Sequence, residues 1–183
     1  MGVFQKNRAF FLFLAKFAIS YLILSGLYWL YLSQYDADLL QTDGMTHSVA
    51  KQSGWLIRWF GEGAFIEPHE SQACYRLYVN NQRVARIVEG CNAVSVMILF
   101  AAFIVAFSTT FKRTLLYILA GLIIIHVLNI LRIALLGLGI FYYRDYAPFL
   151  HDVVFPLFIY GVVFVLWVAW VIKFSGNAKT TSA

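Results

Sequence analysis

The stretch of sequence that decides the fold is Leu115–Tyr142, which reads LLYILAGLIIIHVLNILRIALLGLGIFY. Apart from one histidine, one asparagine and one arginine, it consists of aliphatic, aromatic and glycine residues. About 20 predominantly apolar residues are enough for a helix to cross the hydrocarbon core of a bilayer. The stretch therefore predicts a transmembrane helix that is long enough to cross the membrane at a tilt.

Three more apolar runs predict further transmembrane helices: Phe10–Leu32, Asn92–Ser108 and Val153–Ile172. Bulky residues follow the first run, so we expect a retained anchor and not a cleaved signal peptide. Of the 183 residues, 61% are hydrophobic and 13% are charged, against about 45–50% and about 25% in soluble domains. Residues 1–183 are therefore expected to form one all-α integral membrane domain with about four transmembrane helices, whose solvent is the lipid bilayer.

Acidic and basic residues are separated along the chain. All nine Asp and Glu residues fall in Ser33–Gly90 or Tyr143–Asp152. The other span ends carry only basic residues, namely Lys6, Arg8, Lys16, Lys112, Arg113, Lys173 and Lys179. Because cytoplasmic segments are enriched in Lys and Arg, both termini, including the tail 173–183, are expected on the cytoplasmic side of the cell inner membrane. The net charge of +5 thus reflects topology, and nucleic-acid binding is not expected.

The outward-facing segment 33–90 is predicted to be an extracytoplasmic insert made of a helix and a β-hairpin. Asp43 is a helix-capping residue type and Gly61 is a helix-terminating one, which predicts a helix to about Phe60. Alternating apolar residues on both sides of a polar Asn-Asn-Gln turn predict a hairpin over Tyr75–Val88. This hairpin would deliver the chain to Cys91 at the start of the second span.

The predicted helix of the insert carries Trp55, Leu56 and Trp59 on its second half. These residues are typical of a helix that lies against lipid headgroups. A cap over the transmembrane bundle explains them equally well, so both interpretations stay open at this point.

Three chemically reactive residues are predicted to share one depth in the membrane. Cys91 lies at the outer start of the second span and His151 at the outer start of the fourth. Arg132 lies 17 residues along the third span, roughly 25 Å from Leu115 at 1.5 Å per residue. That depth is close to the outer edge of a hydrocarbon core about 30 Å thick.

Each of these residues also has a structural explanation. Cys91 is explained as a small apolar residue, or as the partner of Cys74 in a disulfide, which persists outside the cytoplasm. Arg132 could extend to the interface and bind a lipid headgroup, and His151 could belong to a surface loop. On these readings the chain is a non-catalytic membrane assembly or transport subunit.

The three residues together form a coherent set for acyl transfer. A histidine and a positive charge stabilise the thiolate that makes a cysteine nucleophilic. Arg132 could also bind the oxyanion of an acyl-transfer intermediate. Asn129, three residues earlier on the same helix face, could orient Arg132, and Asp152 could orient His151.

The other histidines are not expected to belong to this site. His126 lies about 240° around the helix from Arg132 and is predicted to form a hydrogen bond to a neighbouring helix. His47 and His69 lack the spacing of metal ligands. Neither a metal nor a cofactor is expected.

Three motifs, in this order, are similar to those of a known family: Glu89-Gly90-Cys91-Asn92-Ala93, Asn129-Ile130-Leu131-Arg132-Ile133 and His151-Asp152. Over spans two to four, about half of the chain, the sequence resembles the exosortase/archaeosortase family, and its short length resembles the type F branch. Where that family often has glycine two positions after the cysteine, this chain has Ala93.

The resemblance implies a membrane-embedded cysteine transpeptidase that cleaves the C-terminal sorting signals of membrane-anchored exported proteins. Cys91 would be the nucleophile, Arg132 its electrostatic partner and His151 the general acid/base, with Glu89 and Asn92 in supporting positions. A thioester acyl-enzyme would pass its acyl group to an acceptor amine or to water. Because many members are longer, an accessory membrane protein or a second copy of the chain is expected to complete the scaffold.

Overall fold

The structure is a computed structural model that describes residues 7–36, 38–108 and 110–175. The predicted cytoplasmic charges Lys6 and Lys179, with most of the predicted tail, lie outside these ranges. The described chain is mostly helical, and the prediction of an all-α membrane protein with a helix and strands inserted after the first helix is confirmed.

Four helices lie side by side in a bundle: α2 (Arg8–Leu32), α4 (Val94–Ala106), α5 (Phe111–Tyr142) and α7 (Phe155–Trp170). Short helical turns lead into and out of α7: η2 (Arg144–Tyr146), α6 (Ala147–Phe149), η3 (Leu150–Val154) and η4 (Val171–Ser175). Three segments are long and apolar enough to cross a membrane: Arg8–Leu32, Phe111–Tyr142 and Arg144–Lys173. The chain is therefore a multi-pass membrane protein.

The second predicted span is shorter than expected. Helix α4 has 13 residues, or about 20 Å at 1.5 Å per residue, against a hydrocarbon core of about 30 Å. Its first turn begins only at Val94 because Ala93 has a left-handed backbone with φ +61°. Whether α4 crosses the membrane stays a prediction.

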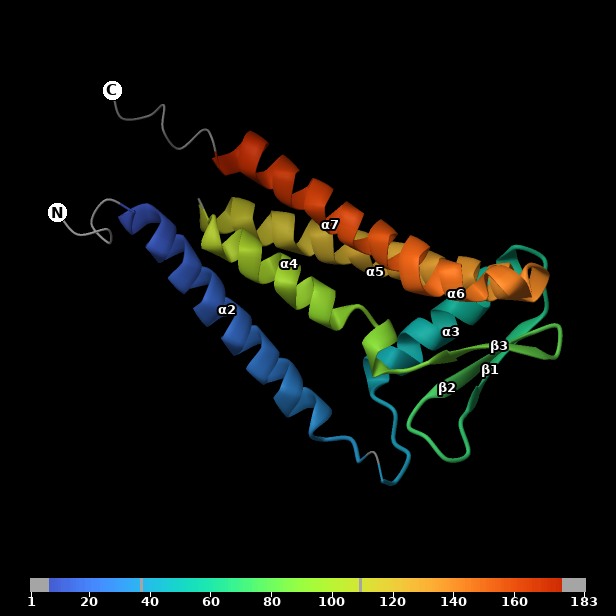
Figure 1. Cartoon of the computed structure of the whole chain (residues 1–183). Helices are drawn as coiled ribbons and strands as arrows, with labels where there is room; N and C mark the ends of the chain where they lie inside the picture. Colours follow the sequence, from blue (N-terminus) through green and yellow to red (C-terminus); the bar gives the residue numbers. More distant parts are fainter. Residues whose placement is uncertain (1–6, 37, 109, 176–183) are drawn as a thin grey trace.

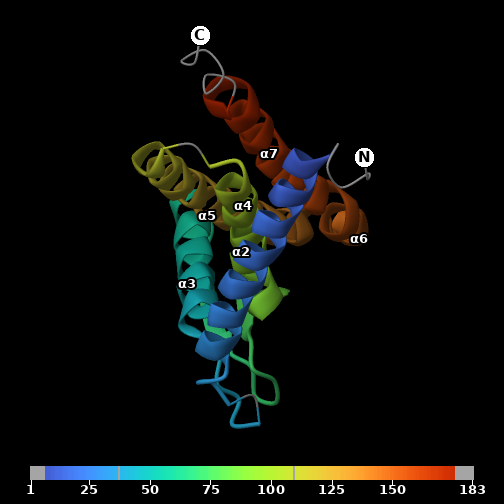
Figure 2. The ribbon, with the colours of Figure 1, turned by 90° about the vertical axis from the view of Figure 1, so that its left-hand side faces the viewer.

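Helix α4 lies in the middle of the bundle, in contact with α2, α5 and α7 (Figure 2). The buried core between these helices contains Phe100, Ile125, Ile159 and Trp170. Helix α5 approaches α4 closely at Gly121, where an added Cβ would lie 2.2 Å from the ring of Phe100. Small residues allow such close helix packing in membranes.

The insert begins with α3 (Gly44–Trp59), which is capped as the sequence predicts. The Asp43 side chain accepts a hydrogen bond of 2.9 Å from the backbone N–H of Thr46. The chain leaves α3 through Gly61, whose φ of +95° suits glycine.

The predicted hairpin is confirmed, but it belongs to a three-stranded sheet. Strands β2 (Tyr75–Val79) and β3 (Gln82–Ile87) pair antiparallel, and β1 (Ala64–Pro68) pairs with β2 on its other side. Strand β1 was not predicted. Among the described residues, strand β3 has a neighbouring strand on one side only.

The insert packs on the C-terminal half of α5. This helix has 32 residues and is about 48 Å long, so it extends well beyond a hydrocarbon core. Its buried Ile133 and Ala134 form a second core with Ile57 of α3 and Leu77 of β2. The insert lies at one end of the bundle, opposite the first turn of α2, the end of α4, the start of α5 and η4 (Figure 1).

One face of α3 therefore caps the bundle while the other stays exposed. Ile57 is fully buried, whereas Trp55 and Trp59 are 61% and 71% exposed. The predicted hydrogen bond of His126 to a neighbouring helix is also confirmed, because its Nε2 lies 2.9 Å from Oε1 of Gln52 in α3.

Candidate active site

A cavity of about 380 Å³ lies where the insert meets the C-terminal half of α5. Four predicted site residues line it: Cys91, Arg132, His151 and Asp152. They come from η1 (Glu89–Cys91), from α5 and from η3. The remaining lining is mostly apolar and is supplied by β3, α5 and α6. Residues that are far apart in sequence thus meet around one cavity, and their catalytic roles stay predictions.

Cys91 ends the short helix η1, and its side chain is half-buried. Its thiol is free, and so is the buried thiol of Cys74. The alternative of a Cys74–Cys91 disulfide is therefore not present in the structure. Cys91 is held through its backbone, because its carbonyl oxygen accepts a hydrogen bond of 2.7 Å from Nδ2 of Asn129.

Asn129 connects the cysteine to the arginine. It is fully buried, and its Oδ1 accepts a hydrogen bond of 3.3 Å from Nη1 of Arg132. This is the orienting contact that the three-residue spacing on α5 predicts. The buried Nε of Arg132 has no protein partner. Arg132 lines the cavity, and its guanidinium has donors beyond the one that bonds Asn129.

His151 and Asp152 form a hydrogen-bonded pair, with 2.7 Å between Nδ1 and Oδ1. Adjacent residues meet in this way within the π-helical turn η3. A carboxylate that accepts from Nδ1–H leaves Nε2 as the basic nitrogen of a neutral imidazole. The two side chains are 58% and 70% exposed. Among the described residues, no direct hydrogen bond links His151 to Cys91.

The predicted supporting residues Asn92 and Glu89 are not among those that line the cavity. The amide of Asn92 donates to the hydroxyls of Tyr28 (2.9 Å) and Thr46 (3.2 Å). Tyr28 in turn donates to Glu89 (3.2 Å). Together they anchor the Cys91 turn to α2 and α3, which is a structural contribution.

Ala93, two positions after Cys91, has a backbone conformation that glycine adopts more readily than alanine. Ala93 has φ +61° and ψ +11°, a left-handed conformation that costs a residue with a Cβ about 1–2 kcal/mol. We expect Ala93→Val to lower the free energy of unfolding by about 2 kcal/mol, because a β-branched residue is least tolerated at positive φ. Thermal unfolding of the purified protein measures this. Ala93→Gly is the matched control, and equal melting temperatures for the two variants would contradict the argument.

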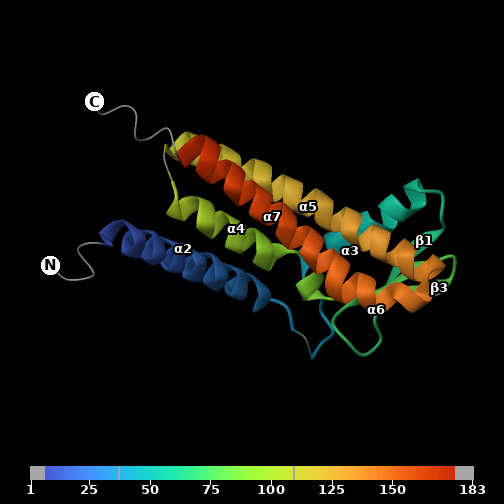
Figure 3. The ribbon, with the colours of Figure 1, turned by 45° about the horizontal axis from the view of Figure 1, so that its top comes forward.

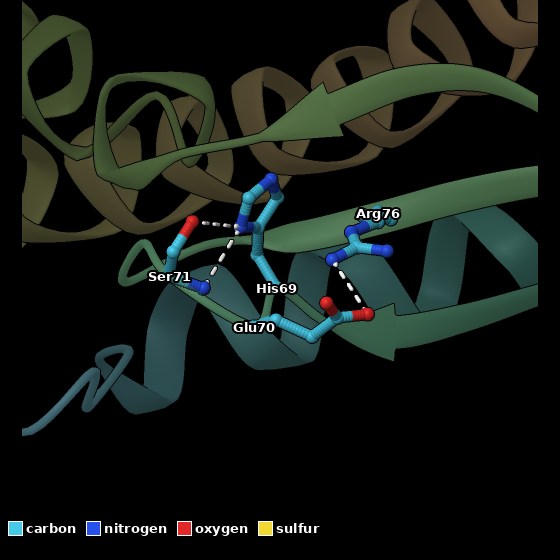
Figure 4. Close-up of polar contacts among 4 residues, drawn as sticks. All are labelled: His69, Glu70, Ser71 and Arg76. Atoms are coloured by element: carbon cyan, nitrogen blue, oxygen red, sulfur yellow. Dashed lines mark hydrogen bonds and ion pairs between the residues drawn. The ribbon is translucent and has the colours of Figure 1, made fainter.

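A second cluster of polar side chains lies in the insert (Figure 4). It contains a serine, a histidine and a glutamate, the residue types of a hydrolase active site, but their hydrogen bonds do not connect all three to one another as such a site requires. The backbone N–H of Ser71 donates to Nδ1 of His69 (3.2 Å), and the Ser71 hydroxyl lies 3.4 Å from the same nitrogen. Glu70 pairs with Arg76 at 3.2 Å and not with His69. These contacts stabilise a turn between β1 and β2. No group of metal-ligating residues occurs among the described residues.

One charged residue of the cavity was missed by sequence reasoning. Arg86 of β3 lines the cavity beside Cys91 and Arg132. The hairpin was predicted, but its placement against α5 and α6 depends on tertiary packing. The sequence feature that indicates it is a charged residue within the otherwise apolar end of the strand.

Comparison with known proteins identifies a family for this chain. A family model described as transmembrane exosortase matches residues 8–174, nearly the whole chain. No curated protein and no solved structure matches it.

Proposed function

The chain belongs to the transmembrane exosortase family, and from that premise we propose that it is a membrane-embedded cysteine transpeptidase. Its substrates would be exported, membrane-anchored proteins with a C-terminal sorting signal, cleaved at the outer face of the inner membrane. The observation that carries this proposal is the shared cavity, which places a free thiol, a guanidinium and an imidazole from three elements around one space.

In the first half-reaction, the sulfur of Cys91 attacks the carbonyl carbon of the scissile peptide bond while Nε2 of His151 accepts the thiol proton. The carbonyl oxygen becomes an oxyanion, which the guanidinium of Arg132 stabilises. When the C–N bond breaks, His151 returns the proton to the leaving amine. The sorting-signal helix departs with that amine, and the exported protein stays on Cys91 as a thioester.

In the second half-reaction, an acceptor amine attacks the thioester carbonyl and His151 accepts its proton. The C–S bond breaks, the Cys91 thiolate leaves, and the proton restores the thiol. Transfer to water by the same steps gives hydrolysis. Asn129 and Asp152 act as positioning residues, because they hold Arg132 and His151 by the hydrogen bonds described above.

The depth of the cavity suits a membrane-held substrate. A sorting-signal helix would lie in the bilayer, and the bond before it would emerge where the outer half of α5 meets the insert. Low water content at this depth would favour transfer over hydrolysis. An accessory membrane protein or a second copy of the chain remains part of the proposal.

Detection of the thioester tests this proposal directly. Purified protein is mixed with a synthetic peptide that contains a substrate's sorting signal, quenched in acid and digested for mass spectrometry. We expect the acyl part of the peptide on Cys91, released by neutral hydroxylamine as a thioester requires. An adduct on Cys74, or none on either cysteine, would contradict the mechanism.

A further inference from the structure

The active-site cavity continues into a second cavity of about 300 Å³. Both are lined by Val84, Ala85 and Arg86 of β3, by Ile140 of α5 and by Ala147 of α6. Ile140 lies eight residues beyond Arg132, about 12 Å farther outward along α5. We call this continuous space the β3 groove. Its walls are β3 and α6, which lie near each other at the outer end of α5 (Figure 3).

The β3 groove is strongly basic. Four arginines line it, namely Arg83, Arg86, Arg132 and Arg144, against a single carboxylate, Asp152. Within the described ranges, the ion pairs are Arg76–Glu70 and His151–Asp152, so no acid of the chain neutralises these four guanidinium groups. Burial and the charges of Arg76 and Arg86 lower the pKa of His69 nearby, as a positive surface should.

One wall of the groove is a strand with a free edge. Within the part of the chain that the structure describes, strand β3 is last in the sheet order and pairs only with β2. The N–H and C=O groups on its other edge are therefore available to an extended peptide, a recurring mode of peptide recognition. The strand has six residues, which corresponds to about 20 Å of extended chain.

We propose that the exported segment preceding the scissile bond binds in the β3 groove as an extended acidic peptide that pairs with the free edge of β3. The identity of this peptide rests on the proposed function. Strand β3 runs toward Cys91, which follows four residues after Ile87. A substrate chain that passes from the outside into the membrane runs in the same direction, so the added strand is parallel to β3. Carboxylates of the peptide pair with Arg83, Arg86 and Arg144.

Peptide binding to the full chain carrying Cys91→Ala tests this proposal without any chemistry. The probe is fluorescein-labelled hexaglutamate, measured by fluorescence anisotropy with the protein in nanodiscs of neutral lipid. We expect saturable binding that weakens with salt. Arg83→Gln, Arg86→Gln and Arg144→Gln should each weaken it by about three- to tenfold. Arg113→Gln is the matched control, because it removes the same charge at the opposite end of the bundle and should change nothing.

Backbone pairing has its own test. Hexaglutamate that is N-methylated at every residue keeps its carboxylates but has no backbone donors, so we expect it to bind at least about tenfold more weakly. Equal affinity of the two probes, or equal effects of Arg113→Gln and Arg86→Gln, would overturn the proposal. So would arginine variants that bind hexaglutamate normally but lose retention of phosphatidylglycerol, which would identify a lipid site. If hexaglutamate binds as expected but the protein with Cys91 forms no thioester, the transpeptidase mechanism is refuted and the peptide-binding proposal for the β3 groove is not.

Discussion

Cells in which the chain carries Cys91→Ala are expected to accumulate full-length, uncleaved substrate in the membrane. Removal of a catalytic nucleophile lowers turnover by more than about 10⁴-fold in enzymes whose reacting groups act as a unit. Processing should therefore fall below detection, and no thioester should form. An immunoblot against a tag placed after the sorting signal measures this, because the tag is lost only upon cleavage.

Cys74→Ala is the matched control for this variant. Cys74 is also a free thiol, but it is buried in the insert and does not line the cavity. Its loss should leave processing within about twofold, provided that the protein reaches the membrane in normal amounts. If Cys91→Ala processed substrate at the normal rate, Cys91 would be a structural residue and the cavity would need another function.

The elements that the sequence predicts well are those that local chemistry determines. Long apolar runs must be helical in lipid because no water satisfies their backbone groups, which explains the success at α2 and α5. Asp43 caps α3 with its own side chain. Its hydrogen-bond partner lies only three residues later in the sequence, so the local sequence is enough to predict the cap. The three-residue spacing of Asn129 and Arg132 likewise predicts their hydrogen bond, because both lie on one helix face.

The elements that were missed depend on packing between distant segments. Strand β1 consists of five residues that end in proline, too short for a clear alternating pattern, and it forms because β2 offers an edge. The left-handed backbone at Ala93 has no signal in the residue itself, because alanine is not a residue type that marks a positive φ. Depth along the spans predicted a common layer for the reactive residues, but it could not predict that β3 brings Arg86 into the same cavity.

Replacement of Arg132 by glutamine is expected to lower kcat/KM for peptide cleavage by about 10²–10³-fold, the usual effect of removing an oxyanion-stabilising donor. Arg132→Lys should recover only part of this loss. Lysine keeps the charge, but it does not reproduce the planar set of five donors that bonds Asn129 through Nη1. Steady-state cleavage of a fluorogenic sorting-signal peptide by purified variants measures both effects.

The same variants separate the two roles that Arg132 could have. If the guanidinium mainly stabilises the thiolate, Arg132→Gln should slow alkylation of Cys91 by iodoacetamide as much as it slows cleavage. If it mainly binds the oxyanion, alkylation should stay near the normal rate, because this reaction develops no charge on a carbonyl oxygen. The geometry favours the second result, since Arg132 is bound to Asn129 and not to the sulfur. Cleavage within threefold of normal in Arg132→Gln would refute both roles, and Arg132 would then serve only to hold the α5 surface of the cavity in place.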